Sequence, residues 1–190
     1  MLNNIQIRAY FSEYNTGVFF VTACVLHHQN LFGEIINGVA HYSILGKRLI
    51  ECIEYANKNY KDVEIIPYVV MPNHFHMVVY IDIDPESTLF SRIADIDPER
   101  KPVNMGALKP KEHFEDESEL LLRHFNSRLS QVCTQIKGGV TRFANNNGIY
   151  FKWQRRFHDH IIRNDRDLKG IIQYIENNIG NWTSDEYYSQ

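Results

Sequence analysis

The chain has 190 residues, of which 44% are hydrophobic, and its formal net charge at pH 7 is −3. This length and composition predict a folded domain and exclude a wholly disordered chain. The small negative charge argues against a protein that coats nucleic acid non-specifically. The sequence has no run of about 18 apolar residues and no leader-like start, so we expect neither a membrane span nor a signal peptide.

The first half of the chain predicts a strand, a helix and a strand hairpin. Residues 18–26 are β-branched and aromatic, which is typical of a strand. Apolar residues recur near a 3.6-residue period over residues 34–59 and predict a helix there. Residues 63–71 and 75–83 predict two strands, and the Pro-Asn dipeptide between them favours a hairpin turn.

The second half begins with a stretch rich in proline and charge. Residues 84–118 are expected to form an insertion loop. A helical period then predicts a long helix over residues 119–144. A last strand is expected at either residues 149–153 or residues 160–163, and a final helix runs from a cap at Asn164 to about residue 179.

This order of elements predicts an α+β fold. Hairpin-linked strands in the middle of a mixed series indicate helices packed on an antiparallel sheet, a ferredoxin-like sandwich formed by one domain over residues 1–190. The chain has three well-separated cysteines, Cys24, Cys52 and Cys133. An odd number of scattered cysteines favours buried free thiols over disulfides or a zinc cluster, so we expect a reducing, cytoplasmic location.

Two histidines at the start of the second hairpin strand are the first candidate for chemistry. Side chains alternate faces along a strand, so His74 and His76 point the same way and Phe75 points the other way. Two such imidazoles can bind one metal ion or one phosphate. Most His-x-His pairs are ordinary polar positions, but this pair follows a turn at the end of a sheet, where ligands can reach it.

The final helix supplies a second candidate. Tyr174 and Asn178 are four residues apart and share a helix face. That face lies beside the stripe expected to be buried, which comprises Leu168, Ile171, Ile172, Ile175 and Ile179. Gly170 leaves space on the tyrosine's face, which suits a substrate strand, a mobile helix or close packing against a neighbouring element. The alternative is that Tyr174 is a packing aromatic residue at the edge of the stripe.

Cations alternate with aromatic residues over residues 151–163, a composition that suits single-stranded nucleic acid. Half-buried strand positions can have the same composition. Residues 137–169 carry eight basic side chains against three acidic ones, which is typical either of a local basic surface that attracts phosphates or of an ordinary solvated charged face. His158 and His160 form a second His-x-His pair, for which we expect structural hydrogen bonding or DNA contact.

Together these segments resemble a known family. The chain is similar to the single-strand DNA transposases of the HUH (His-hydrophobic-His) tyrosine class, and most of all to the REP-associated tyrosine transposases. The resemblance spans most of the chain and rests on four motifs in the same order: YVVMPNHFH at residues 68–76, IKGGVTRF at 136–143, WQRRFHDHIIR at 153–163 and YIENN at 174–178.

The resemblance implies a role for each matching residue. His74, His76 and Asn178 would bind a divalent metal, Mg²⁺ or Mn²⁺, and Tyr174 would be the nucleophile. Members of the family work as dimers, often with the tyrosine helix of one subunit completing the site of the other. Ile179 departs from the family pattern, because close relatives carry proline there.

The implied activity is cutting and rejoining of DNA near hairpins through a 5′-phosphotyrosine intermediate, with single-stranded or hairpin DNA as the partner. The residues expected to contact DNA are Lys137, Arg142, Lys152, Trp153, Gln154, Arg155, Arg156, His160 and Arg163. One alternative is a domesticated transposase that binds DNA hairpins without cutting them. Another is a metal-independent two-histidine phosphoesterase, in which the second His-x-His pair would take part and Tyr174 would be idle.

Overall fold

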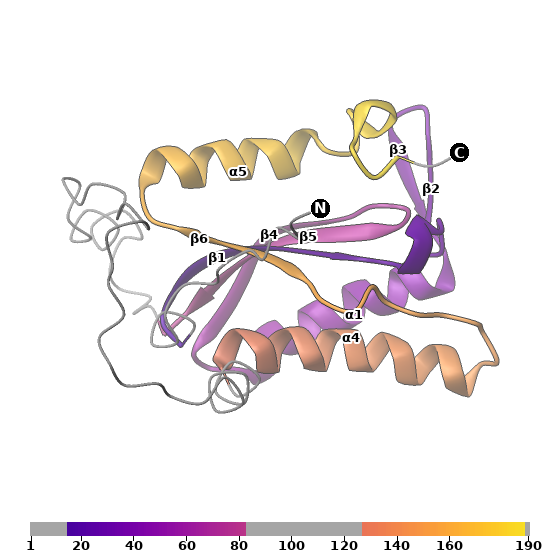
Figure 1. Cartoon of the computed structure of the whole chain (residues 1–190), viewed down its shortest axis with the longest axis horizontal. Coiled ribbons are helices and arrows are strands. Elements are labelled where there is room, and N and C mark those ends of the chain that lie inside the picture. The colour runs from indigo at the N-terminus through magenta and orange to yellow at the C-terminus, as the bar shows by residue number, and fades with distance from the viewer. Residues whose placement is uncertain (1–14, 83–126, 189–190) are drawn as a thin grey trace, which may run out of the picture.

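The computed structural model describes residues 15–82 and 127–188. These residues form a central sheet with helices on both faces (Figure 1). The expected insertion at residues 84–118, and the start of the helix predicted from residue 119, lie outside the described residues. Among the described helices, none has both the length and the apolar character needed to cross a membrane.

Within residues 15–82 and 127–188, the main sheet has four antiparallel strands in the order β4-β5-β1-β6. They are β1 (Gly17–Cys24), β4 (Val63–Val70), β5 (His74–Ile81) and β6 (His158–Ile162). Strand β1 lies between β5, the second strand of the hairpin, and β6, which is the split βαβ arrangement of ferredoxin-like folds. The predicted α+β class is confirmed.

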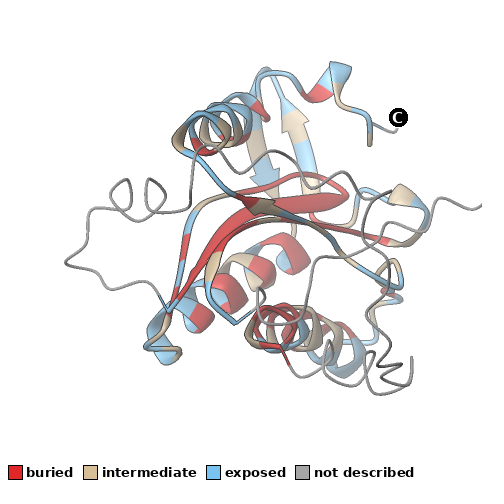
Figure 2. Ribbon diagram, turned by 60° about the vertical axis from the view of Figure 1, so that its left-hand side comes forward, coloured by how far each residue is buried: buried red, intermediate tan, exposed pale blue. Residues whose placement is uncertain are grey.

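Two hydrophobic cores lie on the two faces of this sheet. Helices α1 (Ile44–Asn59) and α4 (Arg128–Asn146) cover one face, and α5 (Asp165–Asn177) covers the other (Figure 1). Strand β5 is buried along its whole length because both faces are covered, and it belongs to the red centre of Figure 2. Its odd-numbered side chains enter the core under α1 and α4, and its even-numbered apolar side chains enter the core under α5.

The helix predicted over residues 34–59 is wrong in its first part. A second, two-stranded sheet forms there from β2 (Gly33–Ile36) and β3 (Val39–Tyr42). The reversal is made by Asn37 (φ 52°) and Gly38 (φ 74°), and consecutive positive φ values are what a tight two-residue hairpin turn needs. The Asn-Gly dipeptide is therefore the local signal that outweighs the apolar spacing on either side of it.

Each long helix begins at a polar cap. The Ser43 hydroxyl accepts hydrogen bonds from the backbone N–H groups of Leu45 and Gly46, so α1 can start only after the hairpin. The predicted cap of the last helix is confirmed, because Asn164 Oδ1 accepts from the backbone N–H of Asp167 at 2.9 Å. Short 3₁₀ turns, η2 (Leu26–His28) and η3 (Trp182–Ser184), complete the described elements.

Of the two positions offered for the last strand, the second is correct. Strand β6 pairs with β1 over residues 158–162, whereas residues 149–153 contribute only a single bridge between Val25 and Trp153. The three cysteines are free and buried, as predicted.

Candidate active site

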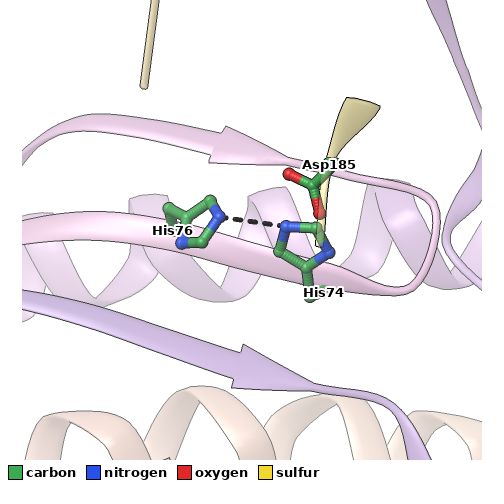
Figure 3. A group of neighbouring side chains, drawn as sticks. All are labelled: His74, His76 and Asp185. Atoms are coloured by element: carbon green, nitrogen blue, oxygen red, sulfur yellow. Dashed lines mark hydrogen bonds between the residues drawn. The ribbon is translucent and has the colours of Figure 1, made fainter. Parts of the chain in front are cut away.

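His74 and His76 lie side by side at the start of β5, on the face covered by α5. Their Nε2 atoms are 3.0 Å apart, so both imidazoles point the same way, as strand alternation predicts (Figure 3). Both side chains are buried, with 0% and 2% of their surface exposed. The pair is therefore part of the floor of the sheet rather than a solvated surface feature.

The outer nitrogen of each imidazole has its own partner. His76 Nδ1 lies 2.7 Å from Thr22 Oγ1, which stands opposite it in the register of β1 and β5. His74 Nδ1 lies 2.8 Å from Asn73 Oδ1, in the turn that precedes the strand. Such partners orient the rings of metal-binding histidines in proteins. The prediction from the sequence did not include either residue.

Burial keeps both imidazoles neutral. It lowers the pKa of His74 to about 2, with the neighbouring His76 and His28 adding to the shift, and it lowers the pKa of His76 to about 3. A neutral imidazole is the form that binds a metal ion, so no proton has to be displaced from a charged ring at physiological pH.

Tyr174 reaches this pair from α5. Its hydroxyl oxygen is 3.2 Å from His76 Nε2, and its ring meets those of His76 and Phe20 edge to face. The side chain is not enclosed, because 41% of the residue surface is exposed. Burial of the hydroxyl end raises the pKa of Tyr174, so the phenol is protonated at neutral pH.

Asn178 is buried at the C-terminal end of α5. Its side chain hydrogen-bonds to Tyr174, which opposes the rise in the tyrosine's pKa, and to Asp185. Its Oδ1 atom is buried without a hydrogen-bond partner among the described residues. A buried carbonyl oxygen without a partner is unfavourable, and a cation would satisfy it.

A carboxylate that the sequence did not reveal completes the group. The ligand atoms of His74, His76 and Asp185 all lie within 4.8 Å of one another (Figure 3). Burial raises the pKa of Asp185 and the charge of Glu186 adds to this, while the backbone N–H of Tyr187 opposes it. Asp185 follows η3, beyond the last predicted helix, and no repeat or motif in the sequence connects it to the histidines.

These residues fit a divalent cation. The two Nε2 atoms are 3.0 Å apart and the ligand atoms of His74, His76 and Asp185 lie within 4.8 Å of one another, so one ion could be held by all three side chains. Two imidazoles with a carboxylate form a common set for divalent metals, and the amide oxygen of Asn178 would add a hard ligand.

A cleft of about 1340 Å³ opens over the site, between α5, β6 and the segment after η3. Tyr174 and His76 line its wall together with Phe20 and Gly170. A Cβ atom added at Gly170 would meet nothing within 4 Å, so the helix face beside the tyrosine is open as the sequence suggested. Tyr174 is therefore accessible to a large substrate, with the buried His76 directly beside its hydroxyl.

Three of the residues expected to contact DNA are engaged within the fold. Lys137 Nζ donates to the backbone oxygens of Gln154 and Arg156, and burial lowers its pKa. The Trp153 indole donates to the backbone oxygen of Lys137 and packs against the main core. The Gln154 amide lies 2.9 Å from His28 Nε2. These contacts hold the segment before β6 against α4.

The other expected DNA contacts are exposed, namely Arg142, Lys152, Arg155, Arg156, His160 and Arg163. His160 lines the cleft and forms an ion pair with Asp167 at 2.7 Å when its ring is protonated. Within the second His-x-His pair, His160 therefore makes a contact within the fold, at the cleft that His76 also lines.

Comparison with known proteins supports the fold. No protein-family model matches the chain. It is 28% identical over 175 residues to an uncharacterized protein of Haemophilus influenzae, a match that covers 90% of this chain and 85% of that protein. The solved structure of a REP-associated tyrosine transposase bound to a REP hairpin superposes with a TM-score of 0.51 at 18% identity, covering 91% of this chain and 71% of that chain. The two chains share a fold.

Proposed function

We propose that this protein is a metal-dependent tyrosine transposase that cuts and rejoins single-stranded DNA near hairpins through a 5′-phosphotyrosine intermediate. One observation carries the proposal: the Tyr174 hydroxyl lies 3.2 Å from His76 Nε2 at an open cleft. A phenol brought from a distant helix to a buried imidazole pair is the geometry that this chemistry needs. The fold shared with a transposase bound to a REP hairpin supports the same conclusion.

The proposed step exchanges one phosphodiester for another. The Tyr174 oxygen attacks phosphorus in line, forming an O–P bond while the bond from phosphorus to the 3′ oxygen breaks. The phenol proton ends on the released 3′ oxygen, which leaves a 5′-phosphotyrosine and a free 3′-hydroxyl. Attack by another 3′-hydroxyl reverses the step and frees Tyr174, so strands can be rejoined without ATP.

A neutral phenol is a weak nucleophile, and the site addresses this in two ways. The hydrogen bond from the Asn178 side chain acts to lower the pKa of Tyr174 and so favours the phenolate. A divalent cation, Mg²⁺ or Mn²⁺, held by His74 and His76 with Asn178 or Asp185 as oxygen ligand, would offset the charge of the phosphate group.

The cleft suits an unpaired strand. Gln173, Asn177 and Asn181 line it at intervals of four residues along and just beyond α5. Their side-chain amides make no hydrogen bond to any other residue in the two described segments. Amides both donate and accept, so they can bind the edges of unstacked bases, which a paired duplex would not offer in this site.

The contact between Tyr174 and His76 of the same chain supports a site formed within one chain. The proposed cutting step therefore does not require the tyrosine of a second subunit. A dimer and a cytoplasmic location stay predictions from the sequence.

The test is adduct formation. The protein is incubated with Mn²⁺ and a labelled single-stranded oligonucleotide from the DNA beside its own gene, and then run on a denaturing gel. We expect a covalent adduct with the wild type and none with Tyr174→Phe. Tyr150→Phe is the matched control, because Tyr150 is exposed and outside the cleft. An adduct with Tyr174→Phe would refute the proposed nucleophile.

The two alternatives predict different outcomes of this assay. A domesticated binding protein would retain hairpins but produce no cleavage with any metal. A two-histidine phosphoesterase would cleave in the presence of EDTA and would not need Tyr174.

A further inference from the structure

We infer that Asn73 is a positioning residue that holds the proton of His74 on Nδ1 and also anchors the segment carrying Asp185. The tautomer follows from the hydrogen bonds alone, whereas its use in presenting His74 Nε2 to a metal rests on the proposed function. One carboxamide would thus prepare two ligands that come from distant parts of the chain.

The orientation of the Asn73 carboxamide is determined by its partners. The side chain is fully buried in the turn between β4 and β5. Its Nδ2 atom donates to the backbone oxygens of His28, at 3.1 Å, and Tyr187, at 2.8 Å. Both partners can only accept, so the nitrogen must face them and Oδ1 must face His74 Nδ1, 2.8 Å away.

This orientation determines the tautomer of His74. A carbonyl oxygen only accepts, so the proton of the neutral ring lies on Nδ1 and the lone pair on Nε2. That lone pair lies 3.0 Å from His76 Nε2. In the metal-free site, an Nε2–H on His76 that donates to His74 avoids two opposed lone pairs. The Tyr174 hydroxyl, 3.2 Å from the same His76 nitrogen, then does not donate to it.

The hydrogen-bond partner of His76, unlike that of His74, allows either tautomer of the ring. Thr22 Oγ1 lies 2.7 Å from His76 Nδ1, and a hydroxyl can rotate to donate or to accept. Thr22 donates when His76 carries its proton on Nε2, and it accepts when the proton moves to Nδ1. His74 is therefore preset for a cation by Asn73, while His76 can change tautomer when a cation binds.

The second role of Asn73 concerns the segment after η3. The Tyr187 oxygen that accepts from Asn73 belongs to a residue whose ring lies 4.7 Å from that of His74 and stacks on that of His28 at 5.3 Å. The Tyr187 backbone N–H donates to Asp185 Oδ1 at 2.7 Å. Holding the Tyr187 backbone therefore also holds the Asp185 carboxylate beside the histidines.

Two substitutions separate the two roles. Asn73→Asp keeps an acceptor for His74 Nδ1–H but places oxygen where the two carbonyls need a donor. Asn73→Ala removes the acceptor as well as both donors. We expect both variants to be less thermally stable than the wild type, and only Asn73→Ala to release the proton of His74 from Nδ1.

The tautomer can be measured directly by long-range ¹H–¹⁵N NMR of the histidine rings in metal-free protein. We expect His74 to be protonated on Nδ1 in the wild type and in Asn73→Asp, and on Nε2 in Asn73→Ala. A proton on Nε2 in the wild type, or on Nδ1 in Asn73→Ala, would overturn the inference. If Asn73→Ala does not fold, Asn73→Leu, which also lacks an acceptor and is similar in shape to asparagine, serves in its place, and the wild-type spectrum is decisive by itself.

Calorimetric titration with Mn²⁺ supplies a second readout that does not depend on cutting. We expect Asn73→Ala to lose affinity about 10- to 100-fold, as is usual for such orienting partners, and Asn73→Asp to lose less. Asn57→Ala is the matched control. The Asn57 side chain, in α1, hydrogen-bonds to the backbone of Ile65 in β4, on the side of the sheet that α1 covers. This substitution should lower stability but leave the His74 tautomer and Mn²⁺ affinity unchanged.

Equal losses of affinity in Asn73→Ala and Asn57→Ala would mean that Asn73 is merely structural. A protein that shows the expected tautomer and Mn²⁺ binding but forms no adduct with DNA would refute the proposed function and leave this inference intact.

Discussion

Two neutral imidazoles, and the Asn178 amide oxygen that has no hydrogen-bond partner within the part of the chain that the structure describes, define the chemistry at the scale of single residues. His74 and His76 were identifiable in the sequence because strand alternation alone puts them on one face. Their orienting partners were not, because Thr22 meets His76 only through the pairing of β1 with β5. Asp185 was missed for a similar reason, since it lies in an irregular segment where no period applies.

The choice of oxygen ligand can be tested at this scale. We expect Asp185→Asn to weaken Mn²⁺ binding at least tenfold, because a carboxylate within 4.8 Å of both imidazoles adds charge as well as a donor atom. Glu186→Gln is the matched control, because it removes the same charge from an exposed neighbour. Similar affinities for the two variants in calorimetric titration would point to Asn178 as the oxygen ligand instead.

The buried histidines also predict how stability depends on pH. Their pKa values of about 2 and 3 in the folded state lie below the ordinary value of 6.5, so the unfolded chain binds more protons in acid. The stability they permit is complete above pH 6.5 and falls as the pH drops toward 3, by up to about 1.4 kcal/mol per pH unit for each ring.

Urea unfolding of metal-free protein between pH 7 and pH 4 measures this dependence. The variant His74→Gln/His76→Gln should lose most of the slope, because it removes both groups. An unchanged slope would show that other groups are responsible for the acid sensitivity.

At the scale of elements, the main strands and the final helix follow from the period of the sequence, and the hairpin of β2 and β3 does not. Residues 35, 39 and 42 have a spacing compatible with a helix, but the turn at Asn37 and Gly38 places them on two short strands. Ser43 is a typical N-cap residue that could have been recognised in the sequence, and it would have corrected the predicted start of the helix.

Two helical glycines give opposite predictions. A Cβ at Gly170 meets nothing within 4 Å, so Gly170→Ala should stabilise the protein by about 0.5–1 kcal/mol. A Cβ at Gly139 would lie 2.6 Å from Cys52 Sγ, so Gly139→Ala should destabilise it by about 1–3 kcal/mol. Chemical denaturation measures both, and a stabilising Gly139→Ala would contradict the packing of α4 on α1.

Gly170 also tests the place of the DNA. Gly170→Leu would project into the cleft and should reduce binding of a single-stranded oligonucleotide at least tenfold without lowering stability. Gly170→Ala, which adds one methyl group, serves as its control in the same fluorescence-anisotropy assay. Unchanged DNA binding by Gly170→Leu would place the strand elsewhere.

At the scale of the whole molecule, the question is whether one chain cuts alone. Because Tyr174 contacts His76 of its own chain, a mixture of Tyr174→Phe and His76→Ala proteins should form no adduct. Adduct formation by the mixture would show that a tyrosine from one subunit serves the histidines of another. Each variant assayed separately provides the baseline.

The burial of β5 on both faces has a consequence for exchange rates. The imidazoles sit on the most enclosed strand of the sheet, whereas Tyr174 and Asp185 come from segments at the periphery. Amide hydrogens of β5 should therefore exchange with deuterium only through global unfolding, while those near residue 185 exchange through smaller openings. A bound ion could then leave when Asp185 alone moves away, while the strand that carries His74 and His76 stays folded.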